Sequence, residues 1–201
     1  MVLMTRVVWI IAAAALAGAC SSGPPGEANY AAEVAAARAV KDASFRAADS
    51  PVPPEKRGQV LPLPYYPVDP AYAVPAAFRE APPAERARVP MQTSTHEVRQ
   101  MDRVGVLEFT LQGQPLRLAA FVEAGESRAV LFVPFTDLTT GTETYAAGRY
   151  LDIPRSPTGI YVVDFNRAFN PYCAYNPSYD CPYPPKENRL PIAIRAGEKT
   201  R

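Results

Sequence analysis

The chain has 201 residues, the length of one domain with room for a short appendage. Only Arg6 of its basic side chains lies within the first twenty residues, so the remainder carries equal numbers of basic and acidic groups. This balance excludes the clustered positive charge by which proteins bind nucleic acid or anionic lipid, and no nucleic-acid partner is expected. The single histidine, His96, excludes metal sites built from several histidines, and the sequence indicates no cofactor.

The N-terminal segment has the pattern of an export signal. Arg6 precedes the apolar run 7–16, which is too short to span a bilayer as a lasting helix. Small residues then lead to Cys20, an order that resembles the bacterial lipobox, although Ala17 replaces the usual leucine. We expect cleavage before Cys20 and lipidation of its thiol, with ordinary secretion as the alternative.

This signal predicts a location at the cell envelope, outside the cytoplasm. The predicted membrane contact is made by the acyl chains on Cys20 alone. Ser21 is typical of lipoproteins sent on to an outer membrane, in a host that has one. Residues 1–20 are therefore interpreted as a lipoprotein signal peptide, residues 21–28 as a flexible tether, and residues 29–201 as a single β-rich domain.

A helix and a proline-rich strap are predicted before the sheet. Asn29 is a suitable cap for an alanine-rich helix that runs to about Ala47, with a thin apolar face that suits packing on the outside of the domain. Prolines recur through residues 51–90, between leucine and tyrosine side chains, and this strap is predicted to wrap over the core. Pro75 cannot donate to a central ladder, so residues 71–78 are expected to form an edge strand.

From residue 87 onward, apolar side chains alternate with polar ones, which is the signal of half-buried strands, and Leu118 is predicted to face the core. Strands are expected at 87–91, near 98, and at 106–111, 116–123, 129–133, 149–153, 160–165 and 190–195. Because no helices intervene, we expect a mainly β fold. It is an antiparallel β-sandwich or small barrel with the N-terminal helix packed outside.

Residues 164–190 are too rich in proline for a helix or strand and too aromatic for a solvated linker. We predict a long ordered loop that its own side chains fix to the sheet. The candidate binding residues, on this loop and the strand before it, are Arg149, Tyr150, Asp164, Asn166, Arg167, Asn170, Tyr172, Tyr175, Glu187 and Asn188. One interpretation is a brace, in which these polar groups satisfy the backbone of an irregular loop.

The other interpretation is a pocket at the end of the sheet. Tyr172 and Tyr175 form its walls, and Arg149 and Arg167 hold an anionic group of the ligand. The polar groups named above then serve a ligand instead of the fold.

The two internal cysteines, Cys173 and Cys181, are interpreted first as a disulfide, because an exported chain folds in an oxidising compartment. Free thiols or a redox couple, and metal ligation with two further ligands, are the alternatives. A calcium site from Asp164, Asn166 and Glu187 matches no known loop spacing, so no metal site is assigned.

Several strings carry a resemblance to a known family. They include N-P-Y-C-A-Y at 170–175, P-P-K-E-N at 184–188, T-E-T-Y at 142–145 and G-R-Y at 148–150. With them, the chain from about Tyr30 to Lys199 resembles the bacterial and archaeal family catalogued as domain of unknown function sixteen eighty-four. The resemblance implies one domain, no established activity, and members both with and without export signals.

The resemblance also bears on two details. Members without export signals would sit in a reducing cytosol, so oxidation of the cysteine pair is not its only role if they keep both thiols. His96 stands where the family pattern tends to have glycine after Thr-Ser-Thr, which predicts a turn with positive φ. His96 is therefore interpreted as a surface turn residue and not as a catalytic base.

The sequence predicts a lipid-anchored envelope protein that acts as a binding or structural module, with an unidentified small ligand or envelope protein as partner. The alternative is a small-substrate enzyme with a carboxylate and arginine site at the 164–190 loop. In that case Asp164 or Glu187 is the acid or base. A pocket lined by these carboxylate and arginine residues, with a perturbed carboxylate, would favour the enzyme, and a filled loop with all its polar groups satisfied would favour the module.

Overall fold

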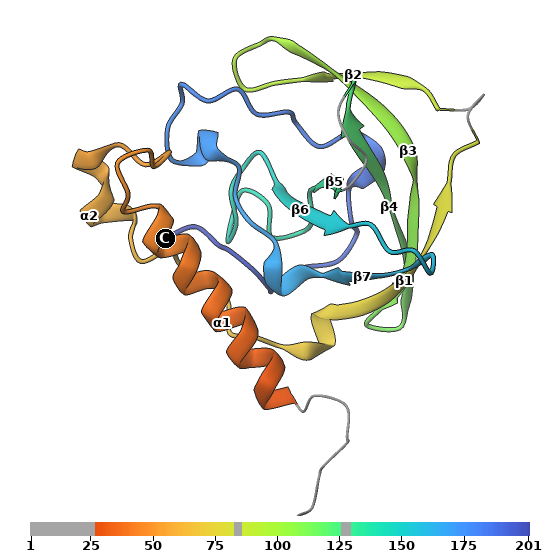
Figure 1. Ribbon diagram of the computed structural model, residues 1–201, viewed down its shortest axis with the longest axis horizontal. Coiled ribbons are helices and arrows are strands. Elements are labelled where there is room, and N and C mark those ends of the chain that lie inside the picture. The colour runs from red at the N-terminus through yellow and green to blue at the C-terminus, as the bar shows by residue number, and fades with distance from the viewer. Residues whose placement is uncertain (1–26, 83–85, 126–129) are drawn as a thin grey trace, which may run out of the picture.

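The computed structural model describes residues 27–82, 86–125 and 130–201. The predicted signal peptide, the lipidated Cys20 and most of the predicted tether lie outside these residues. The first described element is helix α1, Glu27–Ser44, which begins two residues before the predicted cap. It packs on the outside of the sheet, as expected, through Val34 and through Phe45 just beyond its end (Figure 1). No helix among the described residues has the length and apolar character needed to cross a membrane.

Seven strands form one antiparallel sheet that is nearly closed into a barrel, so the predicted mainly β fold is confirmed. The strands are β1 (Ala73–Glu80), β2 (Arg88–Gln92), β3 (Val98–Leu111), β4 (Gln114–Glu123), β5 (Val130–Phe135), β6 (Arg149–Pro154) and β7 (Ile160–Asp164). Their order is β6-β5-β4-β3-β1-β7, and β2 pairs with one end of β3. In Figure 1 the long strands β3 and β4 curve around the core, and β6 and β7 lie at the two ends of the sheet.

The β3–β4 hairpin shows how the alternating pattern becomes a core. Gln112 and Gly113 both have positive φ, which matches the right-handed twist of the two strands and makes a tight turn. Leu107 pairs with Leu118 across the hairpin, and both side chains are fully buried inside the barrel. Full burial of such a side chain stabilises the fold by roughly 1.5–3 kcal/mol. The predicted inward orientation of Leu118 is therefore confirmed.

The interior of the barrel differs from its outer face. Inside, Leu131, Val133, Leu151 and Ile153 join the main apolar core. On the outer face of the same strands, Phe121 and its neighbours form a second cluster, which β2 and the loop after β7 cover. Residues 164–190 form that loop, and its short 3-10 turns are η4 (Phe165–Arg167), η5 (Tyr172–Ala174) and η6 (Lys186–Asn188).

The predicted edge strand around Pro75 is wrong. Strand β1 lies between β3 and β7, inside the sheet. Pro75 is tolerated there because pairing with β3 begins only at Ala76, so at Pro75 the strand is paired on the β7 side alone.

The predicted strand 190–195 is absent from the described structure, although its side chains do alternate. Leu190, Ile192 and Ile194 are buried in the barrel core. Their backbone makes isolated hydrogen bonds with the segment after β5, from the Leu190 N–H to the Thr136 carbonyl group and from the Leu138 N–H to that of Ile192. The carbonyl group of Ile194 accepts instead from the Arg149 guanidinium, so no regular strand forms. The alternation therefore correctly predicted burial and wrongly predicted pairing.

The strap between α1 and β1 is ordered, and it buries apolar side chains against the rest of the molecule as predicted. It contains the short helical elements η1 (Pro54–Lys56), α2 (Arg57–Val60) and η2 (Pro70–Tyr72). Val52 and Leu63 pack with Phe45 and Tyr175 in a separate small cluster. The strap therefore links α1 to the loop that follows β7.

Candidate functional site

Asp164 and Asn166, two of the predicted site residues, form a strut between β7 and the N-terminal helix. The Asp164 carboxylate accepts hydrogen bonds from the Tyr30 hydroxyl at 2.7 Å and from the Asn166 N–H at 3.0 Å. The Asn166 amide donates to the Tyr30 hydroxyl and to the Asp69 carbonyl, and it accepts from the Asp69 N–H at 3.0 Å. Both residues are buried, so their polar groups serve helix α1 and the strap.

The two arginines predicted to share an anion lie in different surroundings. Only 1 % of Arg149 is exposed to solvent, and its guanidinium forms an ion pair with Asp137 at 2.7 Å. The same guanidinium donates to the carbonyl groups of Ile194, Ala196 and Glu198. The shared anion site is therefore not formed, because the Arg149 donors are occupied inside the protein.

Arg167 is instead half exposed and pairs with Asp164 at 3.0 Å. Its guanidinium reinforces the strut on the outside of the molecule, away from the buried Arg149 network.

Asn170 belongs to a third polar group beneath the C-terminal tail. Its amide donates to the fully buried Glu198 carboxylate at 3.1 Å, and Lys41 of helix α1 pairs with the same carboxylate at 2.7 Å. Burial raises the pKa of Glu198, and the nearby Lys41 ammonium lowers it in part. These contacts fasten the tail to helix α1 and leave the Glu198 carboxylate without access to a ligand.

Asn188 and Glu187 adjoin in sequence and serve different ends. The Asn188 side chain is fully buried and completes the ladder between β4 and β5, through the N–H and C=O of Ala119 and the C=O of Pro134. Glu187 lies at the surface in a two-bonded ion pair with Arg103. The two alternative candidates for the catalytic acid or base, Asp164 and Glu187, therefore lie in two separate networks.

The cysteine pair is buried, and both thiols are free in this structure. The two residues lie side by side, since the Cys173 N–H donates to the Cys181 sulfur at 3.1 Å. The hydrogen bond with Cys181 lowers the pKa of the Cys173 thiol, with help from the Tyr145 hydroxyl at 3.8 Å. Their proximity agrees with the predicted pairing, and the disulfide itself stays a prediction.

His96 has a φ of 67°, as the sequence predicted for a turn in place of glycine. It lies between β2 and β3, where its N–H donates to the Thr93 carbonyl group. Across the described ranges, no group of three or more His, Cys, Asp or Glu side chains is arranged to hold a metal ion.

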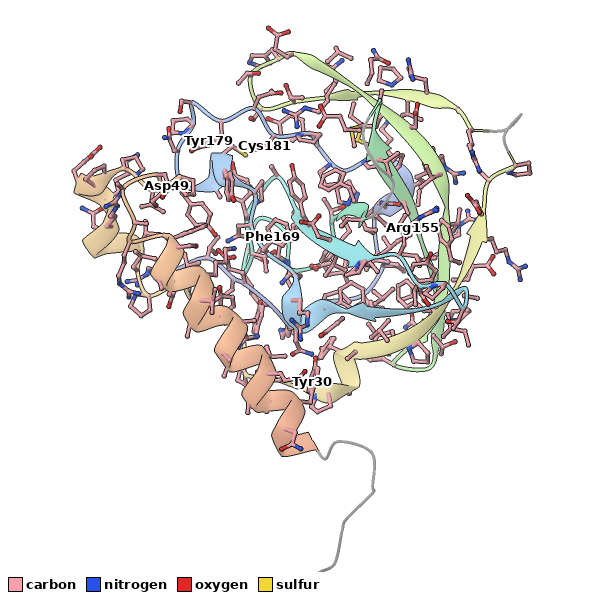
Figure 2. All side chains as sticks on the ribbon, in the orientation of Figure 1. Tyr30, Asp49, Arg155, Phe169, Tyr179 and Cys181 are labelled. Carbon is pink, nitrogen blue, oxygen red and sulfur yellow. The ribbon has the colours of Figure 1, made fainter. Side chains whose placement is uncertain are left out.

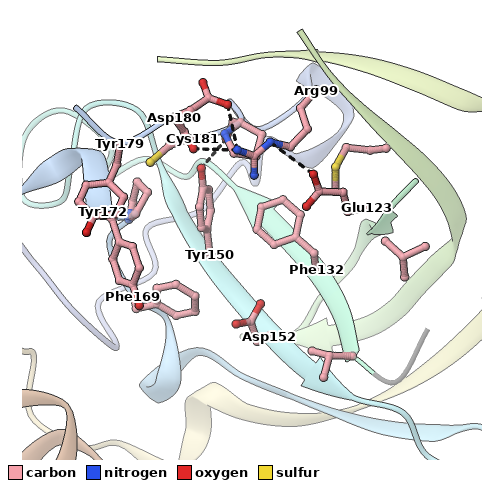
Figure 3. Close-up of a pocket in the computed structure, with 15 residues that line it drawn as sticks. Arg99, Glu123, Phe132, Tyr150, Asp152, Phe169, Tyr172, Tyr179, Asp180 and Cys181 are labelled. Atoms are coloured by element: carbon pink, nitrogen blue, oxygen red, sulfur yellow. Dashed lines mark hydrogen bonds and ion pairs between the residues drawn. The ribbon is translucent and has the colours of Figure 1, made fainter. Parts of the chain in front are cut away.

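A groove of about 760 Å³ lies on the outer face of the barrel. Its floor is formed by β5 and β6, and residues 169–182 of the loop form one wall (Figure 3). This volume falls in the range of small-molecule sites, about 300–1,000 Å³. We call this hollow the outer groove.

Aromatic rings dominate the outer groove. Phe132 packs edge-on to Tyr150, with 4.7 Å between ring centroids, and Tyr150 packs edge-on to Phe169 at 5.9 Å. Tyr172 and Tyr179 form a further edge-to-face pair at the loop wall. Figure 2 places Phe169 between helix α1 and strand β6. The loop is held there by two backbone hydrogen bonds between Tyr150 and Phe169. The rings are thus fixed by the fold.

Asp152 is the one carboxylate on the groove floor. It lies opposite Phe132 in the β5–β6 register, and in Figure 3 it stands below Tyr150, between Phe132 and Phe169. The Asp152 side chain is exposed at the groove mouth, and its partial desolvation within the groove raises its pKa. Within the described residues its side chain forms neither a hydrogen bond nor an ion pair. Asp164, in contrast, accepts hydrogen bonds from Tyr30, Asn166 and Arg167.

The charged groups at the rim are paired with one another. Arg99 forms an ion pair with Asp180 at 2.9 Å and approaches Glu123 at 3.8 Å. Arg99 also donates to the Asp180 carbonyl, and Thr95 donates to the Asp180 carboxylate at 2.6 Å. The rim therefore holds its own positive charge in place and does not neutralise Asp152.

Of the ten predicted binding residues, the outer groove includes Tyr150 and Tyr172. Tyr175 is instead buried against Phe45 in the small cluster under the strap. Sequence reasoning missed Asp152, Phe132 and Phe169. The available signal was an acid between the inward-facing Leu151 and Ile153, but the sequence does not reveal that the loop covers this outward position.

Comparisons with known proteins agree with the predicted family. Residues 61–199 match the model of a family described as protein of unknown function, DUF1684. The chain is also similar to an uncharacterised protein of Haloarcula marismortui, solved by solution NMR, with 35 % identity and a TM-score of 0.69. That similarity covers 86 % of this chain and 95 % of the other. No curated protein matches the chain.

Proposed function

Since the chain belongs to the DUF1684 family of proteins of unknown function, its activity has to be inferred from its own residues, and we propose that it is a lipid-anchored binding module of the cell envelope. The binding site in this proposal is the outer groove. In this proposal the lipid on Cys20 holds the domain at a membrane.

The observation that carries the proposal is a difference between two sets of polar side chains: those with partners inside the fold, and the carboxylate of Asp152, which has none among the described residues. The side chains of Asp164, Asn166, Arg149 and Asn188 are occupied by contacts within the fold. Asp152, in contrast, is an exposed carboxylate that lines an open, aromatic hollow and has no hydrogen-bond or ion-pair partner in the described chain. A few placed polar groups in a largely apolar concavity are typical of small-molecule sites.

The enzyme alternative at the 164–190 loop has little support. It needs Asp164 or Glu187 beside an arginine that is free to hold an anion. Arg167 does lie beside Asp164, but the two are paired with each other, Arg149 is paired with Asp137, and Glu187 is paired with Arg103. Binding without turnover therefore remains the proposal.

The groove is tested by screening a library of small uncharged fragments with ligand-observed NMR on the full chain in detergent. Val130→Trp fills the outer groove, because Val130 lines it and is 44 % exposed. The control is Val98→Trp, which adds the same ring at a 45 % exposed position that does not line the groove. We expect fragments that bind the parent and Val98→Trp and are lost from Val130→Trp. Equal binding to all three proteins would contradict the proposal.

The address is tested separately, by labelling cells with a clickable fatty acid. We expect label on the parent and none on Cys20→Ala. A parent protein that stays unlabelled and soluble would remove the lipid anchor and leave the groove proposal untouched.

A further inference from the structure

The outer groove has an electrostatic imbalance that narrows the kind of ligand it accepts. Its charged lining residues are three acids, Asp152, Glu123 and Asp180, and one base, Arg99. Arg99 is occupied by Asp180 and Glu123, which leaves the Asp152 carboxylate as the charge that lacks a counter-ion. Any ligand that displaces water from the groove has to replace the hydration of this carboxylate.

Positive side chains from the neighbouring elements do not neutralise Asp152. A smaller hollow of about 420 Å³ continues from the outer groove toward helix α1 and shares Asp152, Phe169 and Tyr172 with it. Two basic residues of this smaller hollow form ion pairs with other acids: Lys41 pairs with Glu198 at 2.7 Å, and Arg167 pairs with Asp164 at 3.0 Å.

Arg38, the third base of this smaller hollow, donates to the carbonyl groups of Tyr66 and Asn166. Among the described residues, no ion pair reaches Asp152 from helix α1. In the described part of the chain Asp152 is therefore left to solvent, and a bound cation could pair with it without breaking an existing ion pair.

The rings around Asp152 suit a cation as well. Aromatic faces attract ammonium and guanidinium groups within about 6 Å of the ring centroid. This fold already uses such contacts, since the Lys41 ammonium lies 5.1 Å from the Phe169 centroid, and the Arg38 guanidinium lies 4.4 Å from that of Tyr65. Phe132 and Tyr150, beside Asp152, have no described cation partner of this kind.

We propose that the outer groove binds an organic cation, with an ammonium or guanidinium group against Asp152 and an apolar body against the rings of Phe132, Tyr150 and Phe169. This inference rests on the proposed binding function and specifies its ligand. A neutral ligand of the same shape leaves the Asp152 carboxylate desolvated and unpaired, and an anionic ligand adds repulsion. A cation removes both penalties.

The test uses probes of matched shape and different charge. They are 3-phenylpropylammonium, its N,N,N-trimethyl analogue, neutral 3-phenylpropanol and anionic 3-phenylpropionate. Affinities for the full chain in a non-ionic detergent are measured by ligand-observed NMR titration. We expect each cation to bind about tenfold more tightly than the alcohol, and the carboxylate to bind most weakly.

Two variants assign the preference to one carboxylate. Asp152→Asn preserves the shape of the side chain and should abolish the difference between ammonium and alcohol. Glu123→Gln removes one negative charge from the same groove but not the unpaired one, and it should keep most of the preference. This pair distinguishes a direct contact with Asp152 from a general attraction to an acidic surface.

Three results would overturn the cation assignment: equal affinity for ammonium and alcohol, a preference that survives Asp152→Asn, or no binding of any cationic probe. The first two leave the groove as a binding site for another ligand, so the proposed binding function stands. If the uncharged fragment library also finds no groove ligand that Val130→Trp removes, the proposed function fails with it.

Discussion

Asp164 lies at the end of β7 and Asp152 lies on β6, and the two carboxylates differ in their contacts. Asp164 accepts three hydrogen bonds from Tyr30, Asn166 and Arg167, and so joins helix α1 to the sheet. Asp152 stands on the groove floor without a partner in the described chain, and desolvation raises its pKa. The comparison teaches that richness in polar residues does not mark a site. Unsatisfied polarity in a concave surface is the more informative feature.

The largest expected difference in the free energy of unfolding is between variants of Arg149 and Arg167, the two arginines predicted to hold an anion. Arg149→Met leaves the buried Asp137 carboxylate without its counter-ion and should lower the free energy of unfolding by about 3–5 kcal/mol. Arg167→Met removes a half-exposed ion pair and should cost less than about 1 kcal/mol. Chemical denaturation of both variants measures the difference. Similar losses would mean that Arg149 is not structural.

The next effect concerns the cysteine pair, which lies where the brace and the groove meet. If Cys173 and Cys181 form the predicted disulfide in the exported protein, a reductant should lower its free energy of unfolding by about 2.5 kcal/mol. The double variant Cys173→Ser/Cys181→Ser should not respond to reductant. Thermal unfolding with and without reductant is the measurement, and an unresponsive parent would indicate that the thiols stay free.

A smaller effect tests the strut itself. Asp164→Asn keeps the shape but weakens the hydrogen bonds from Tyr30 and Arg167, and should cost about 1–2 kcal/mol. Glu187→Gln breaks only an exposed ion pair with Arg103 and should cost less than about 0.5 kcal/mol. Unchanged midpoints in both variants would show that the polar groups of the 164–190 loop are not a brace.

The smallest expected effect is a gain in stability at neutral pH for the variant Asp152→Asn, whereas the variants above lose stability. The raised pKa of Asp152 means that the folded state holds this proton more tightly than the unfolded state, so ionisation removes stability as the pH rises through the folded pKa. Asp152→Asn lacks this loss. Its stability relative to the parent should therefore rise between acid conditions, below the ordinary aspartate pKa of about 3.9, and neutral pH. Unfolding curves of both proteins across this pH range provide the measurement, and a relative stability that falls would contradict a desolvated carboxylate.

Much of the fold follows from local pattern. The two-residue alternation correctly predicted β4 and the inward orientation of Leu118, because one face of that strand is buried. The strands expected near 98 and at 106–111 are a single strand, β3, and β5 was predicted from a continuous apolar run. The same pattern failed at 190–195, where side-chain burial is periodic but the Arg149 guanidinium replaces a neighbouring strand as hydrogen-bond donor. Pairing depends on which backbone lies alongside, and a single stretch of sequence does not contain that information.

The candidate site was harder to predict than the fold. Tyr172 was identified from a loop rich in aromatic residues, and Tyr150 from the predicted strand 149–153. Asp152 was not, because an outward-facing acid on a strand is ordinarily exposed to solvent. Its special position depends on the long-range backbone pairing of Phe169 with Tyr150, which brings the loop over the outer face of β6. Such a tertiary contact leaves no periodic signal near residue 152.

The tail segment 194–198 has a consequence for the order of events during synthesis. The Arg149 guanidinium meets three carbonyl groups of this segment, and the Cβ-free Gly197 packs against the carbonyl groups of Phe165 and Ala168 at a φ of 77°. Until residue 198 has been translated, the buried Arg149 guanidinium lacks these acceptors. Completion of this buried network is therefore a late step in the folding of the chain.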